Sequence, residues 1–100
     1  IRDANSPWEA YLDLEVVNLP FTMRCRRAGD RYKPLGLDGH SIKLADFFIN
    51  SKVPKRARDS WPLLFSNEEL AWVPGFQPAH PFRLTSASRK AVRIRLERDH

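Results

Sequence analysis

The sequence is poor in cysteine and in long apolar runs. Its 100 residues include one cysteine, Cys25, so they cannot form an intramolecular disulfide or supply a cysteine-based zinc site. The unbroken apolar runs are a few residues long, whereas a membrane helix needs roughly 18 or more. The N-terminus lacks the charged-then-apolar pattern of a signal peptide. We therefore expect a cytoplasmic protein without a membrane partner.

Patterns that carry catalysis are also missing. His40, His80 and His100 are isolated from one another and from other metal-ligating residues at helical spacing. Cys25 falls on the apolar side of a predicted strand, which predicts an inert core thiol. The sequence has neither a serine nucleophile elbow nor a glycine-rich phosphate loop. We expect no active site, cofactor or metal in this chain.

The composition indicates one folded module. Hydrophobic residues make up 42% and charged residues 29% of the chain, which is typical of a globular domain. We expect a single domain over residues 1–100 with a folded core at about residues 10–98, because a chain of this length buries enough surface to fold without disulfides. Since it begins with Ile1 rather than Met, we expect the full protein to be larger.

Alternating apolar and polar residues predict the strands. They lie at residues 12–16, 21–26 and 92–96, with a hairpin formed by 63–65 and 70–73 around a four-residue turn. In the first strand, Leu12, Leu14 and Val16 share the apolar face. In the second, Phe21, Met23 and Cys25 form the apolar face, which predicts that Arg24 and Arg26 lie outside.

Two short helices are predicted in the middle of the chain. Residues 31–40 contain four turn-forming residues and predict a basic loop. Ser41 then suits the cap of a helix with Leu44, Phe47 and Phe48 on one face. A second helix starts at Pro54 and ends before Pro62. The order of elements predicts an α+β domain with a small mixed or antiparallel sheet.

Positive charge is concentrated in the same middle region. Lys and Arg total 17 against 12 for Asp and Glu, and residues 21–60 hold ten bases and four acids. Twelve of the bases are arginines, whose guanidinium groups match phosphate oxygens. This region predicts a nucleic-acid interface, in which Tyr32 could stack on a base. The alternative is a merely soluble face, in which four acids pair with bases: Asp30, Asp38, Asp46 and Asp59.

Several segments of this region carry a family pattern. Residues 27–36 read R-A-G-D-R-Y-K-P-L-G, residues 43–49 read K-L-A-D-F-F-I, and residues 52–55 read K-V-P-K. Arg58-Asp59 and Pro62-Leu63-Leu64 follow, and a hairpin ends in L-A-W-V-P-G at residues 70–75. In this order, from about residue 21 to 96, the chain resembles the C-terminal domain of tRNA(Ile)-lysidine synthetase.

The resemblance implies a parent enzyme that uses ATP to adenylate the wobble cytidine of tRNA(Ile) with a CAU anticodon and then attaches lysine. The ATP-binding S-G-G-x-D-S loop belongs to another domain of that family and does not occur here. This domain is implied to hold the tRNA toward its acceptor stem. Its fold is implied to be similar to a tRNA synthetase editing-type module, such as that of the phenylalanyl-tRNA synthetase beta chain.

The resemblance also names the candidate tRNA contacts. The matched basic positions are Arg27, Arg31, Lys33, Lys43, Lys55 and Arg58. The neighbouring basic residues Lys52 and Arg56 complete the set of candidates. Gly29 matches a turn residue and is expected to have a positive φ. Gln77 departs from the pattern, because many members have arginine at that position.

A docking role is the alternative function. In that case the domain would contact the N-terminal domains of the parent enzyme or a second subunit in a homodimer, and the basic face would be incidental. Its exposed anchors would be Leu37, Ile42 and Phe76. Such a domain would bind tRNA no better than any other basic protein.

Overall fold

The computed structural model describes residues 7–97, so the predicted boundary at residue 98 and His100 lie outside the described residues. The elements are β1 (Glu9–Asp13), β2 (Phe21–Arg24), β3 (Arg31–Tyr32), β4 (Ile42–Lys43), α1 (Leu44–Asn50), α2 (Lys55–Arg58), β5 (Leu63–Ser66), β6 (Glu69–Trp72), the 3-10 helix η1 (His80–Phe82) and β7 (Ala91–Arg95). This order confirms the predicted α+β class.

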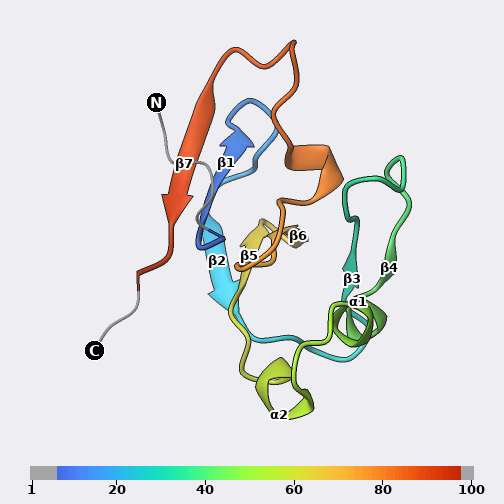
Figure 1. The fold of residues 1–100 in the computed structure, drawn as a ribbon. Helices are drawn as coiled ribbons and strands as arrows, with labels where there is room; N and C mark the ends of the chain where they lie inside the picture. The colour runs from blue at the N-terminus through green and yellow to red at the C-terminus, as the bar shows by residue number, and fades with distance from the viewer. Residues whose placement is uncertain (1–6, 98–100) are drawn as a thin grey trace.

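The strands form three separate antiparallel groups instead of one small sheet. β1 pairs with β7, β2–β5–β6 form a three-stranded sheet, and β3 pairs with β4. Figure 1 shows the β1–β7 ribbon on the left, the three-stranded sheet in the middle, and β3–β4 with α1 on the right. In the same view α1 lies at the base of β3 and β4, and α2 is lowest (Figure 1).

The predicted first strand is displaced toward the N-terminus. β1 spans Glu9–Asp13 and pairs with β7 from Glu9↔Arg95 to Asp13↔Ala91. Leu12 is fully buried, whereas Leu14 and Val16 are 37% and 45% exposed. The prediction that Leu12, Leu14 and Val16 share one inner face is therefore wrong, because the chain leaves the ribbon after Asp13.

The predicted faces of the second strand are also wrong. Met23 is 44% exposed and Cys25 follows the end of β2 as an exposed thiol. Arg24 is instead half-buried, with its guanidinium carbon 3.9 Å from the centre of the Phe65 ring. The sheet accepts this arginine because a guanidinium can stack on an aromatic face while its charge is paired.

The expected basic loop contains part of a short β-ladder. Arg31 pairs with Lys43 and Tyr32 with Ile42. Tyr32 is 2% exposed and its hydroxyl donates a hydrogen bond to the carbonyl of Gln77. Burial raises the pKa of Tyr32 above its usual range. The prediction that Tyr32 could stack on a base is therefore wrong.

The two predicted helices and the predicted hairpin are confirmed, but their first and last residues differ from the prediction. Lys43 rather than Ser41 precedes the first turn of α1, and no side-chain cap bond forms there. Leu44 and Phe48 of α1 are buried, and Phe47 packs beside the core. In the hairpin, Ser66 already pairs with Glu69, so the turn is tighter than the predicted four residues.

Asp30 joins three segments of this fold. Its carboxylate accepts two hydrogen bonds from the Arg24 guanidinium at 3.0 Å and one from the Arg27 backbone N–H at 2.7 Å. Its carbonyl accepts the backbone N–H of Leu44 at the start of α1. We call this group of bonds the Asp30 clamp. Gly29, just before it, has the predicted positive φ, at 89°.

The clamp also sets the charge state of Asp30. Burial alone would raise the pKa of this carboxyl, but the hydrogen bonds from Arg24 and from the Arg27 backbone outweigh it. The pKa of Asp30 therefore lies below its ordinary value of 3.8. A carboxylate that is bound more tightly when ionised stabilises the folded state only while it stays ionised.

Two variants test whether Leu12 is buried and Leu14 is exposed. We expect Leu12→Ala to lower the free energy of unfolding by about 2–5 kcal/mol, because it empties a fully buried site. Leu14→Ala removes the same atoms from an exposed site and should cost less than about 1 kcal/mol. Urea denaturation measures both, and equal losses would contradict the observed burial.

The clamp predicts a pH dependence of stability. We expect Asp30→Asn to cost about 1–2 kcal/mol at neutral pH, because it weakens charge-assisted hydrogen bonds. The depressed pKa means that the contribution of Asp30 is complete above pH 3.8 and is lost as the pH falls through the folded-state pKa. Urea unfolding of both proteins from pH 6 downward should show the difference shrinking toward acid. A constant difference would contradict the clamp.

Candidate nucleic-acid interface

The eight predicted contacts come from two stretches of chain. Arg27, Arg31, Lys33 and Lys43 lie in or beside the β3–β4 ladder, and the other four lie between the end of α1 and the end of α2: Lys52, Lys55, Arg56 and Arg58. Figure 1 shows that α1 lies at the base of β3 and β4, with α2 next to it. Tertiary structure thus brings both stretches to one end of the molecule.

Three of the eight residues line one small hollow. The basic hollow, as we name it, has a volume of about 200 Å³ and is lined by Arg26, Arg27, Gly29, Asp30, Arg31, Lys43, Leu44 and Ala45. Its one acid, Asp30, is already held by the clamp. Four cationic side chains therefore surround a space whose acidic group is neutralised, an arrangement suited to an anion such as phosphate.

Arg26 is the residue of this hollow that the prediction omitted. It forms an ion pair with Asp59, with the two atoms 3.0 Å apart. This pair connects the segment before β3 to the residue that follows α2. The run of arginines at positions 24, 26 and 27 was the available signal, but sequence spacing alone does not show which of them line a common hollow.

Most of the eight candidates carry unpaired charge. Within residues 7–97, five of them make no side-chain hydrogen bond or ion pair: Arg27, Lys43, Lys52, Lys55 and Arg56. Arg31 donates to the hydroxyl and carbonyl of Ser41, and Arg58 donates to the carbonyl of Val53, so all three bonds are to neutral groups. Lys33 pairs with Glu69 at 3.3 Å and is the one candidate with an acidic partner in this part of the chain.

Two aspartates of this region form ion pairs with arginines that are not among the eight candidates. Asp30 pairs with Arg24 and Asp59 with Arg26. In the described part of the chain, Asp38 and Asp46 form no ion pair. Two of the four ion pairs that the alternative of a merely soluble face requires are therefore confirmed, and both go to arginines outside the eight candidate contacts. The arginines of the β1–β7 side are paired instead, as Arg89–Glu15, Arg93–Glu9 and Arg95–Glu97.

The proposed docking anchors occupy different environments. Leu37 is 40% exposed, but Ile42 and Phe76 are half-buried. Phe76 packs edge-on against Phe47 at 5.1 Å. Gln77, at the position where the family pattern often has arginine, is exposed, and its carbonyl accepts the Tyr32 hydroxyl. The three anchors therefore do not form one exposed apolar surface.

Metal-ligating side chains do not gather within residues 7–97, where no cluster of three or more of them occurs. No helix in that range is long and apolar enough to cross a membrane.

Comparison with known proteins assigns the family. Residues 21–96 match the model described as the TilS substrate C-terminal domain. The chain is 40% identical over 96 residues to the tRNA(Ile)-lysidine synthase of Geobacter sulfurreducens, covering 90% of this chain and 20% of that protein. It is 40% identical over 90 residues to the enzyme of the same name from Symbiobacterium thermophilum, covering 90% of this chain and 18% of that protein. The chain thus spans about a fifth of the length of these relatives.

A solved structure agrees with the observed fold. The crystal structure of a TilS C-terminal domain superposes with a TM-score of 0.71 at 31% sequence identity, covering 93% of this chain and 69% of that one. The family match at residues 21–96 includes the β3–β4 and α1–α2 region that carries the candidate contacts. The chain therefore belongs to the TilS substrate C-terminal domain family.

Proposed function

We propose that this chain is the domain that holds tRNA(Ile) in an ATP-dependent tRNA(Ile)-lysidine synthase of the cytoplasm. The parent enzyme would attach lysine to the wobble cytidine of the CAU anticodon, with ATP bound in another domain. The chain itself would be a binding module, a single domain with its core at about residues 10–98. The proposal is supported by the family to which the chain belongs and by the names of its relatives.

The main support for a binding role is the unequal distribution of unpaired cations between the two sides of the molecule. The candidate contacts at the helix end remain mostly unpaired, whereas the arginines of the β1–β7 side have carboxylate partners. Unpaired cations can neutralise phosphates and release their counterions, which drives nucleic-acid binding. Paired cations must first give up a carboxylate, so they contribute less.

The acceptor stem is the part of the tRNA that we assign to this face. An A-form stem presents phosphates and 2′-hydroxyls, because its deep major groove hides the base edges. A face with many cations and no protruding aromatic ring in the basic hollow suits such a backbone. The relationship to a tRNA synthetase editing-type module is part of the same proposal. Tethering to other tRNA-binding domains would add affinity through effective concentration.

Charge-matched variants test this proposal. We expect the double variant Arg27→Ala with Lys43→Ala to weaken binding to CAU-anticodon tRNA(Ile) by about 10- to 100-fold, because it removes two phosphate contacts. Arg89→Ala with Arg93→Ala removes the same charge from the β1–β7 side and should weaken binding less than about threefold. Fluorescence anisotropy with labelled tRNA measures both.

The salt dependence and a second tRNA complete this test. If about five phosphates are neutralised, log K should fall against log salt with a slope of about −3 to −5, and the double variant should lower its magnitude by about 2. Elongator methionine tRNA serves as the competitor, and tighter binding of tRNA(Ile) would show identity recognition by this domain. Equal losses in the two double variants would contradict the proposed face and favour a docking domain.

A further inference from the structure

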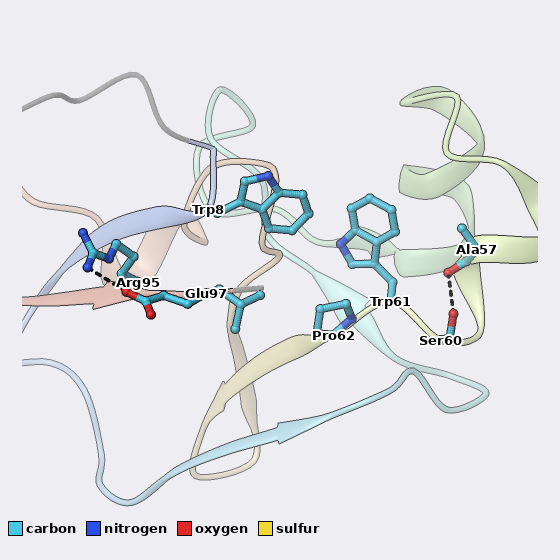
Figure 2. Close-up of a pocket in the computed structure, with 8 residues that line it drawn as sticks. Trp8, Ala57, Ser60, Trp61, Pro62, Arg95 and Glu97 are labelled. Atoms are coloured by element: carbon cyan, nitrogen blue, oxygen red, sulfur yellow. Dashed lines mark hydrogen bonds and ion pairs between the residues drawn. The ribbon is translucent and has the colours of Figure 1, made fainter. Parts of the chain in front are cut away.

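A second cavity lies beside α2 and is aromatic rather than basic. It has a volume of about 670 Å³ and is lined by Trp8, Ala57, Ser60, Trp61, Pro62, Arg95, Leu96 and Glu97. We call it the tryptophan groove. Figure 2 shows Trp8 and Trp61 side by side at its centre, with Arg95 and Glu97 on one side and Ala57 and Ser60 on the other. Its volume is within the range of about 300–1,000 Å³ that is typical of small-molecule sites.

Hydrogen bonds to the backbone hold the Trp61 indole ring and the main chain of Trp8, and the two rings pack against each other. Their centroids are 6.0 Å apart and their planes differ by 30°. The Trp61 indole N–H donates to the carbonyl of Pro74 at 2.8 Å, and the carbonyl of Trp8 accepts the N–H of Leu96. A side-chain carbon at Gly75 would lie 3.2 Å from Trp61 and 3.5 Å from Trp8, so glycine permits this arrangement. These contacts fix the wall of the groove on the Trp61 side.

The rings are accessible at the surface. Trp8 is 37% exposed and Trp61 is half-buried. The remaining tryptophan, Trp72, is fully buried and packs in the core. Exposed, rigid aromatic rings in a concave site are suited to stacking on a flat partner, because little side-chain freedom is lost on binding.

The groove is lined by one cation and one anion, Arg95 and Glu97, and two further cations precede Ala57 in α2. Ala57, in its wall, lies in α2 next to the unpaired Arg56 and two residues from the unpaired Lys55. Arg95 on the opposite side pairs with Glu97, but both side chains are more than half exposed. An exposed ion pair of this kind contributes little to stability. Arg95 can therefore exchange Glu97 for a phosphate, but it contributes less to binding than the unpaired cations of α2.

We propose that the tryptophan groove binds an unpaired nucleobase of an RNA strand. The base stacks on Trp8 and Trp61, and the cations of α2 together with Arg95 hold the adjoining phosphates. Single-stranded RNA is commonly bound in this way, by aromatic stacking beside a basic track. The inference rests on the proposed function, because it extends the same RNA-binding face across α2, from paired stem to unpaired strand.

The test uses two RNA hairpins that differ only at the end. One carries four unpaired adenosines at its 3′ end, and the other carries four abasic residues with the same phosphates. We expect the 100-residue chain to bind the first about tenfold more tightly than the second by fluorescence anisotropy, which corresponds to stacking of one base. Equal affinities would overturn the proposal. Loss of binding to both probes would instead reject the proposed function and this inference with it.

Variants connect the effect to the groove. Trp8→Ala should bring the adenosine hairpin to the affinity of the abasic one and leave the abasic hairpin unchanged. Trp8→Phe keeps an aromatic face and should retain most of the difference. Ile49→Ala is the control, because Ile49 is an apolar residue of α1 that is 54% exposed and lies outside the groove. A loss of the same size in Ile49→Ala would overturn the assignment to Trp8.

A protein partner would give a different result. If the groove received a segment of the parent enzyme, Trp8→Ala in the full-length protein would increase proteolytic cleavage around this domain without RNA. The ratio of the two hairpin affinities would then be close to 1 in the isolated chain. That combination would overturn the proposal in favour of a docking surface.

Discussion

The carboxylate of Asp30 holds the basic segment in place. It binds the guanidinium of Arg24, which lies on the Phe65 ring in the central sheet, and the backbone of Arg27 in the basic hollow. The carbonyl of the same residue receives the first backbone N–H of α1. One residue thus connects the three-stranded sheet, the β3–β4 ladder and the helix. Such a short segment needs this connection, because a two-residue ladder has too few hydrogen bonds to fix its own position.

The same connection explains how a basic surface can remain unpaired. Asp30 and Asp59 are bound by Arg24 and Arg26, two arginines that support the segment from within. Asp30 and Asp59 are therefore already occupied, and within residues 7–97 five of the candidate cations form no side-chain hydrogen bond or ion pair and can bind an external anion. On the β1–β7 side, by contrast, glutamates on β1 and around it pair with the arginines. The molecule thus carries one paired side and one basic end.

The aromatic residues join the core to the surface. Tyr32, Phe47, Phe76, Trp61 and Trp8 form a series in which each ring lies 4.7 to 6.1 Å from the next. The series begins at a fully buried tyrosine and ends at an exposed tryptophan. Since each ring packs against the next, the position of the surface indoles depends on the packing of the core. This gives the tryptophan groove the rigidity that a stacking site requires.

The sequence by itself determined the α+β class, the hairpin, the two short helices and the basic character of the middle of the chain. These features depend on local periodicity, turn residues and composition, which act over a few neighbouring positions. It also carried the family pattern, and the family assignment agrees with it. That pattern includes Arg27, Arg31 and Lys43 among its basic positions, and the three side chains line one hollow.

Only the tertiary structure decided which faces are inside. The alternation in residues 21–26 predicted a buried Met23 and Cys25, but Arg24 turned inward because Phe65 and Asp30 together provide a ring face and a counter-charge. Tyr32 was buried for a similar reason, since the carbonyl of Gln77, 45 residues away, accepts its hydroxyl. The tryptophan groove likewise joins residues from both ends of the chain. Partners so distant in sequence leave no periodic signal, because their effect exists only once the chain has folded.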